Sequence, residues 1–410
     1  MKRAAACASC AKDRSDYADT RRGGGAVADR HTRMTHRNQR LLRRMLMVAA
    51  FAASVFSAGC ASHRRPTGRD EAGSNAASVP AVEQVSATAE ATAAERPSVV
   101  APGRANVFGE IDGMTGRTMS GGDQGLQQHT ATGEGYDADV TVDPSGRWMA
   151  YASTRHSERP DIYLQRVDGT SVTQLTGDPA DDVQPTFSPD GRRIAFASNR
   201  SGNWDIYVMD VDGTNVVQVT CSPAQEMSPS FSPDGNRLVY CSLGRDEQWE
   251  LWVVNLASAE RRMIGHGLFP AWSPQKDVDR IAFQRARQRG SRWFSLWTLD
   301  LVDGEARRVT EVASSGNAAA VTPAWSPDGQ RLAFTTIVSP QDCGGARQDV
   351  WVVRADGSGR TRLTGGPGTY LSPCWAAGDR IYFISSRGGA ENVWSVRAGS
   401  AGVLPVADTK

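Results

Sequence analysis

An alternation of apolar and polar positions recurs six times after about residue 136. Each unit opens with a short alternating run that ends at a turn, most completely written Ser-Pro-Asp-Gly. Three further alternating runs follow, and in four units an Asp-Gly pair joins the last two. Alternation with a period of two predicts strands with one buried face, and Pro, Asp and Gly at these spacings predict tight turns. The pattern therefore predicts six repeats of four short antiparallel strands.

The turn cores keep a nearly constant spacing, with intervals of 45, 44, 41, 53 and 50 residues at the proline position. They are residues 142–146, 187–191, 231–235, 272–274, 325–329 and 375–378. An aromatic residue follows on the second strand of every unit: Tyr151, Phe196, Tyr240, Phe283, Phe334 and Phe383. Another lies on every third strand: Tyr163, Tyr207, Trp252, Trp297, Trp351 and Trp394.

A single sheet of this size cannot bury both of its faces, whereas a ring of such sheets buries the aromatic residues between neighbours. We therefore predict an all-β fold, a six-bladed β-propeller of four-stranded antiparallel blades, over residues 126–410. Residues 126–130 match the fourth-strand pattern but precede the first unit. We expect them to form the outer strand of blade six and close the ring, although residues 403–406 could supply that unit's own fourth strand.

The chain before the repeats reads as an export signal followed by a tether. A basic stretch at 37–44 precedes an apolar run, Met45–Phe56, which is shorter than the ~20 residues that span a bilayer. Ser57-Ala58-Gly59-Cys60 resembles the lipobox of bacterial lipoproteins, which implies cleavage before Cys60 and acylation of that residue. Ordinary secretory cleavage and a chance apolar patch are the alternatives. Translation could also start at Met34.

These features divide the chain into four parts. Residues 1–59 form the leader and signal peptide, and 60–104 form a tether whose Ala, Ser, Thr, Pro and Glu residues cannot bury enough surface to order it. Residues 105–125 stay unassigned, and 126–410 form the propeller. Export permits disulfides, so Cys221, Cys241, Cys343 and Cys374 are either free or include one disulfide.

Charge excludes one class of partner, and composition excludes one class of protein. The net charge of +1 combines 12 basic and 4 acidic residues in 1–59 with 34 basic and 41 acidic residues in 60–410. A mildly acidic body lacks the basic footprint of a nucleic-acid-binding protein. A hydrophobic content of 40% is too low for a protein with many membrane spans.

The run at 185–220, Pro-x-Phe-Ser-Pro-Asp-Gly followed by Ile-Ala-Phe, Asp-Ile-Tyr-Val and Asp-x-Asp-Gly, resembles the propeller repeat of the TolB family. It is also similar to the propellers of dipeptidyl-peptidase-type enzymes. The first resemblance implies a periplasmic protein that binds a Pal-like, peptidoglycan-associated lipoprotein. TolB proteins also carry an α/β domain before the propeller, and a low-complexity tether occupies that stretch here.

No candidate catalytic residue, metal ligand set or cofactor site emerges from the sequence. There is no G-x-S-x-G nucleophile motif, and His129, His156 and His266 fall at unlike positions of the repeat. An arginine four residues after the second-strand aromatic recurs as Arg155, Arg200, Arg287 and Arg387, and we interpret this repetition as structural.

One position suggests a binding site at the channel end where the inner strands begin. Three residues before the first-strand proline, or its equivalent, the units carry Asp137, Asp182, Glu226, Gly267, Ala320 and Tyr370. The three acidic residues, with Phe269 and Tyr370, are our candidate partner-binding mouth. The alternative is ordinary solvated loop charge.

Together these observations predict a monomeric, lipid-anchored, non-catalytic platform for protein binding on the periplasmic side of the cell envelope. Ala61 after Cys60 favours the outer membrane over the inner one, by resemblance to sorted lipoproteins. Two alternatives stay open: a propeller that binds or cleaves a glycan or peptide, and a sensor subunit for a separate catalytic chain.

Overall fold

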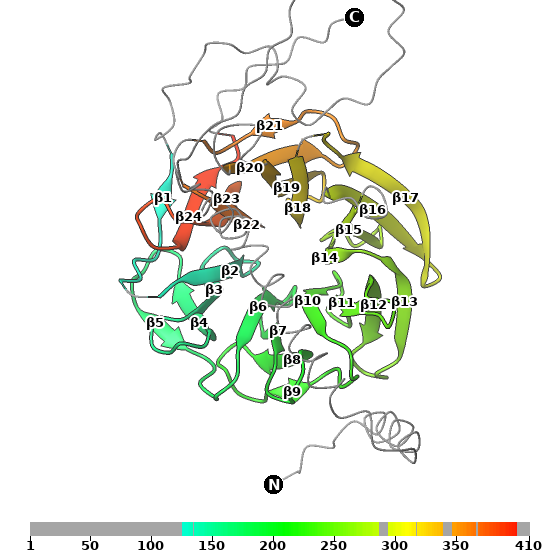
Figure 1. The fold of residues 1–410 in the computed structure, drawn as a ribbon, viewed down its shortest axis with the longest axis horizontal. Coiled ribbons are helices and arrows are strands. Elements are labelled where there is room, and N and C mark those ends of the chain that lie inside the picture. The colour runs from blue at the N-terminus through cyan, green and yellow to red at the C-terminus, as the bar shows by residue number, and fades with distance from the viewer. Residues whose placement is uncertain are drawn as a thin grey trace, which may run out of the picture.

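A computed structural model describes residues 125–133, 135–286, 294–316, 318–338, 347–365 and 368–399. These residues form six four-stranded antiparallel sheets arranged around a central axis, and they contain no helix (Figure 1). The predicted six-bladed β-propeller is therefore confirmed. No helix within the described ranges is long and apolar enough to cross a membrane. The predicted leader, the tether, Cys60 and residues 403–406 lie outside the described residues.

The first three blades each follow chain order from the inner to the outer strand. Blade one comprises β2 (Asp137–Val142), β3 (Trp148–Ser153), β4 (Asp161–Arg166) and β5 (Val172–Gln174). Blade two comprises β6 (Asp182–Phe187), β7 (Arg193–Ser198), β8 (Asp205–Asp210) and β9 (Val217–Gln218). Blade three comprises β10 (Glu226–Phe231), β11 (Arg237–Leu243), β12 (Trp249–Asn255) and β13 (Arg261–His266).

Blades four and five repeat this order, and blade six is completed from the other end of the chain. Blade four comprises β14 (Leu268–Trp272), β15 (Arg280–Ala286), β16 (Phe294–Val302) and β17 (Glu305–Ala313). Blade five comprises β18 (Ala318–Trp325), β19 (Arg331–Val338), β20 (Arg347–Arg354) and β21 (Thr361–Arg362). Blade six comprises β22 (Tyr370–Ala376), β23 (Arg380–Ser385), β24 (Asn392–Arg397) and β1 (Gln127–Gln128).

The strand β1 closes the ring, as the sequence predicted. It pairs antiparallel with β24, with Gln127 opposite Ser395 and Gln128 opposite Trp394. The next residues continue the closure: the His129 amide donates to the Val393 carbonyl over 2.8 Å. The Val393 amide in turn donates to the Thr130 hydroxyl over 2.9 Å. Residues from the two ends of the described chain thus share one blade.

The serine of the turn core closes the first hairpin of several blades. The Ser188 hydroxyl donates to the Asp190 carboxylate over 2.5 Å and accepts the Arg193 amide over 3.0 Å. Gly191 takes a φ of 69°, which glycine adopts without the steric cost that a side chain would add. Ser232 and Ser326 make the same hydrogen bonds in their own turns.

The two aromatic positions of each repeat lie directly opposite one another on neighbouring strands. In blade two, Phe196 faces Tyr207 with ring centroids 5.8 Å apart. The other five pairs keep this register: Tyr151 with Tyr163, Tyr240 with Trp252, Phe283 with Trp297, Phe334 with Trp351, and Phe383 with Trp394. The second-strand members are all buried, and burying each contributes roughly 1.5–3 kcal/mol.

Candidate functional site

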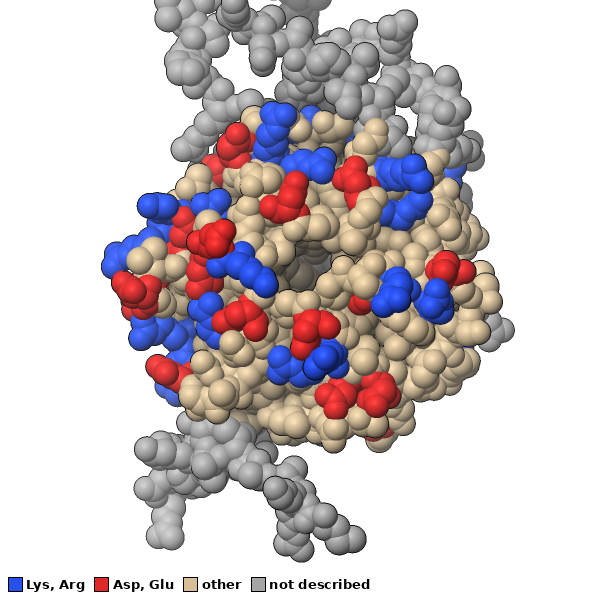
Figure 2. Space-filling view, turned by 180° about the vertical axis from the view of Figure 1, so that it is seen from behind, with Lys and Arg blue, Asp and Glu red and all other residues tan. Residues whose placement is uncertain are grey.

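The six inner strands surround a central cavity of about 570 Å³. It extends from the middle of these strands to the turns that follow them, an end that we call the turn mouth. The opposite end, where the inner strands begin, is the strand-start mouth. Figure 2 shows the central hollow from the face opposite to that of Figure 1, with mostly uncharged residues at its rim and charged side chains farther out.

A β-bulge interrupts every inner strand at the same position of the repeat. The register shifts there in all six blades. The first bulge residue has a φ between 48 and 56°: Asp139, Gln184, Ser228, Phe269, Thr322 and Ser372. Proline follows it in five blades, and because proline has no N–H to give to the ladder, a bulge is one of the few places it fits in a sheet.

The bulges connect neighbouring blades around the cavity. The carboxylate of Asp139 accepts the backbone N–H of Gln184 in the next blade. Gln184 Oε1 then accepts the amide of Ser228 over 2.8 Å. Farther round the ring, the amide of Thr322 donates to Gln284 Oε1 over 2.9 Å. These contacts tie neighbouring blades together around the cavity.

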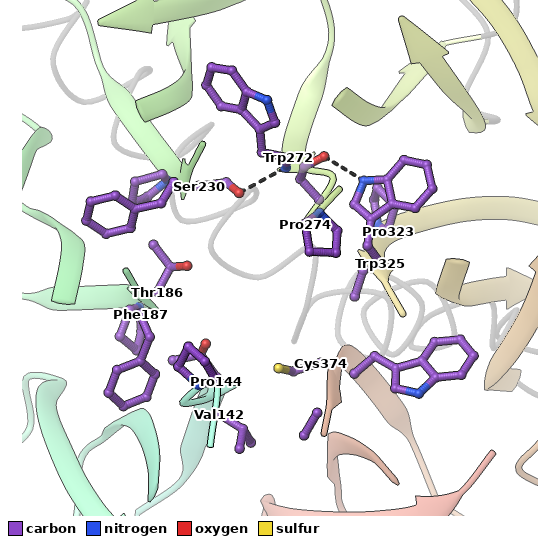
Figure 3. A pocket seen from close by; sticks show the side chains of 18 of the residues that line it. Val142, Pro144, Thr186, Phe187, Ser230, Trp272, Pro274, Pro323, Trp325 and Cys374 are labelled. Atoms are coloured by element: carbon purple, nitrogen blue, oxygen red, sulfur yellow. Dashed lines mark hydrogen bonds between the residues drawn. The ribbon is translucent and has the colours of Figure 1, made fainter. Parts of the chain in front are cut away.

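The cavity wall is predominantly apolar and rich in proline (Figure 3). Small side chains face the axis in each blade: Thr141, Thr186, Ser230, Ala271, Ala324 and Cys374. Large apolar residues follow them: Val142, Phe187, Phe231, Trp272, Trp325 and Trp375. The Ser230 hydroxyl accepts the Trp272 amide over 3.0 Å, and the Trp325 indole donates to the Ala271 carbonyl over 2.9 Å.

Among the residues lining this cavity, three carry ionisable charges: Asp139, Asp143 and Lys276. Burial raises the pKa of Asp139 to about 6, against the opposing effect of the Gln184 amide. Asp143 is occupied within its own turn, where it accepts the amides of Arg147 and Trp148. Within the described ranges, no group of three or more His, Cys, Asp and Glu side chains could hold a metal ion. The wall therefore offers shape and apolar surface more than charge.

The acidic residues predicted for the strand-start mouth are not exposed. Asp137 and Asp182 are 0% exposed and Glu226 is 2% exposed. Arg155 Nη2 lies 3.2 Å from Asp137, and Arg200 Nη2 lies 2.8 Å from Asp182. The expected exposed acidic arc is therefore absent.

In blades one and two the reason is that the arginine after the second strand folds back over the carboxylate. Arg200 also covers the rings of Phe196 and Tyr207, at 5.3 and 5.0 Å from their centroids. Burial raises the pKa of Asp182, although Ser198 and Arg200 favour its ionised form. The structural role predicted for Arg155 and Arg200 is confirmed, whereas Arg287 lies outside the described residues.

The two aromatic residues of the predicted mouth separate. Phe269 is a bulge residue and lines the central cavity. Tyr370 is buried, donates its hydroxyl to the Gly365 carbonyl over 3.1 Å and packs edge-on against Phe383. Of the five predicted site residues, the structure therefore places one at the cavity. The bulge ring itself was missed, although a proline in the middle of an inner strand was a readable signal.

The cysteines divide into two groups. Cys241 and Cys374 are free, and burial raises the pKa of their thiols to about 12 and about 11. Cys221 is disulfide-bonded. Cys60 and Cys343 lie outside the described residues.

Parts of the repeat region are similar in sequence to known propeller proteins. A family model described as the tricorn protease N-terminal β-propeller domain matches residues 158–295. A TolB homolog from Chlorobium luteolum is 42% identical over 66 residues, which are 16% of this chain and 15% of that protein. The Tol-Pal system protein TolB of Anaeromyxobacter dehalogenans is 45% identical over 51 residues, 12% of this chain and 10% of its own length.

The oligogalacturonate lyase structure from Vibrio parahaemolyticus aligns with a TM-score of 0.49 and 12% identity, covering 67% of this chain and 94% of that one. The sequence matches to the TolB proteins, in contrast, span only a small part of those relatives.

Proposed function

We propose that this protein is a non-catalytic, TolB-like platform for protein binding in the bacterial cell envelope, with the central cavity as its binding surface. The observation that carries the proposal is the cavity wall, in which each blade contributes a small side chain and a large apolar one around about 570 Å³. Apolar concave surfaces with a few placed polar groups are where proteins bind their ligands. The local sequence similarity to TolB proteins supports a partner of protein class.

A rigid ring suits such a platform. The bulges and interblade hydrogen bonds preorganise the wall, so a partner segment does not have to order it on binding. Recognition then comes from the wall and from the turns at the turn mouth, of which Pro189 and Pro327 are exposed. Phe269 is the residue of the predicted mouth that takes part.

The location and partner belong to the same proposal. The signal features of residues 1–59, acylation at Cys60 and a tether over 60–104 would place the propeller on the periplasmic side of a membrane, with the outer membrane favoured. The partner is then a Pal-like or other peptidoglycan-associated envelope protein. No nucleic acid and no cofactor takes part, and the propeller acts as a monomer.

A crosslinked pull-down of the tagged full chain from envelope membranes tests the proposal. Thr186 faces the cavity, so Thr186→Tyr should fill part of it and reduce partner recovery about tenfold or more. Thr173→Tyr makes the same change on the exposed outer strand β5 and should leave recovery unchanged. Equal recovery with all three proteins would contradict binding in the cavity, and recovery of hydrolases or of glycan alone would contradict the Tol-like role.

A further inference from the structure

Two buried carboxyl groups meet between blades two and three, away from the central cavity. Asp205 begins β8 and Glu226 begins β10, and their exposed fractions are 1% and 2%. One oxygen of each is satisfied by neutral donors: Ser201 and Gln218 donate to Asp205 Oδ2, and Ser222 donates to Glu226 Oε1 over 2.7 Å. The side chains of Asp205 and Glu226 also interact directly with each other.

The remaining two oxygens lack a donor. Asp205 Oδ1 and Glu226 Oε2 are buried and receive no N–H or O–H group of the described residues. A buried carboxylate oxygen without a donor is costly, and two ionised carboxylates in contact repel one another. A proton between the two groups removes both costs, because the protonated carboxyl donates to the other.

The contact between two neighbouring blades is called a seam here. In the seam between blades one and two, the equivalent acidic residues lie beside a cation. These residues are Asp161 and Asp182, and Arg200 lies 2.8 Å from Asp182. In the next repeat Gly244 stands at the position of Arg200. Replacing arginine by glycine takes the guanidinium away from the second seam while both acids stay.

Among the other groups of the described residues that face the pair, one carries a positive charge. Arg261 Nη1, from the outer strand β13, lies 3.8 Å from Glu226 Oε1. The phenols of Tyr207 and Tyr240 are neutral, since burial raises their pKa further, and Thr220 contributes a hydroxyl to Glu226. One guanidinium, at ion-pair distance from Glu226, therefore faces two carboxyl groups.

We propose that Asp205 and Glu226 share one proton and thereby make the seam between blades two and three a pH-sensitive joint of the propeller. Burial supports this, because it raises the pKa of Asp205 to about 7 and also raises the pKa of Glu226. The unfolded chain releases the same proton near pH 4. Stability from this proton is therefore complete below about pH 4, declines as the pH rises and is lost above about pH 7.

The test is the pH dependence of urea unfolding of the full chain, compared between wild type and Asp205→Asn. One linked proton changes the folding equilibrium constant about tenfold per pH unit. The asparagine amide donates to Glu226 at every pH. Between about pH 5 and 7, the folding equilibrium constant of this variant should therefore fall less steeply than that of wild type, by up to tenfold per pH unit. Asp168→Asn makes the same chemical change in an exposed turn and should keep the wild-type slope.

A second variant and a direct readout keep the test decisive. Glu226→Gln removes the shared proton from the other side and should flatten the same slope if Asp205→Asn does not fold. In the wild type, the infrared carboxylic-acid band of the pair should be present at pH 5 and lost by pH 9. Wild-type slopes in both variants would overturn the proposal. Stabilisation of wild type by Ca²⁺ at pH 8 that Asp205→Asn abolishes would also overturn it, because a cation would then fill the gap.

Discussion

Thr322 is the β-branched member of the six bulge residues, and its φ is 50°. A β-branched residue in this region is a genuine outlier, because its side chain collides with the backbone. Its hydroxyl is also buried without a hydrogen-bond partner among the described residues. The backbone N–H, in contrast, is used, since it donates to Gln284. The bulge therefore needs the backbone of residue 322 but not its side chain.

Thr322→Gly should for this reason stabilise the protein. Glycine removes the steric strain of the left-handed backbone conformation, and this gain outweighs the larger conformational entropy of the unfolded glycine variant. The expected increase in the free energy of unfolding is about 1 kcal/mol. Urea unfolding at constant pH measures it. Thr322→Val is the control: it retains the branched side chain and removes the unpaired hydroxyl, so the glycine variant should be more stable than the valine variant. A less stable glycine variant would show that the hydroxyl does contribute.

The site residues also show where reasoning from residues alone ends. Asp137 and Asp182 were correctly placed at the start of inner strands, but their exposure depends on what covers them. They are covered by Arg155 and Arg200, which lie eighteen positions later and fold back onto them. Residue spacing does not predict that contact. The positions of the acidic residues could therefore be predicted from the sequence, whereas their burial could not.

At the scale of elements, local signals predicted nearly everything. The Pro-Asp-Gly turns and the paired aromatic positions fixed the strand order within each blade, because both are properties of one hairpin. The bulges were harder to predict, since proline in a strand is consistent with either a bulge or an edge strand. The seams between blades were not predictable, because they join residues of different repeats.

The seam between blades one and two supplies an element-scale prediction. Arg200→Ala leaves Asp182 buried without its cation and removes the guanidinium from two aromatic rings, so it should cost about 3 kcal/mol. The matched control is Arg166→Ala. The ion pair of Arg166 with Asp168 is exposed, so this substitution should leave the Tm unchanged. Thermal unfolding compares the two. Equal effects would mean that the buried pair adds nothing beyond a surface pair.

At the scale of the whole molecule, ring closure was predictable because residues 126–130 repeat the fourth-strand pattern. A chain that begins at residue 131 lacks β1 and the four hydrogen bonds that residues 129 and 130 make with blade six. At about 1 kcal/mol each, the loss is roughly 4 kcal/mol, or a fall in Tm on the order of 10 °C.

The control for this truncation is a chain that begins at residue 125 and retains β1. Hydrogen exchange at the Val393 amide locates the effect, because that amide donates to Thr130 in the closed ring. Faster exchange at Val393 with unchanged exchange in blade three is the expected result. An unchanged Tm after removal of residues 125–130 would show that the ring does not depend on β1.

The closing strand also has a mechanical consequence. The polypeptide before residue 125 is covalently continuous with β1, so tension applied to that segment reaches the ring first through this strand. Only two residue pairs, supplemented by the contacts of His129 and Thr130, resist it there. The other blades are each continuous in sequence and take up none of the pull until β1 has detached. The propeller therefore places a joint of two residue pairs between itself and whatever holds its N-terminal side, and this joint would open before the other blades bear the load.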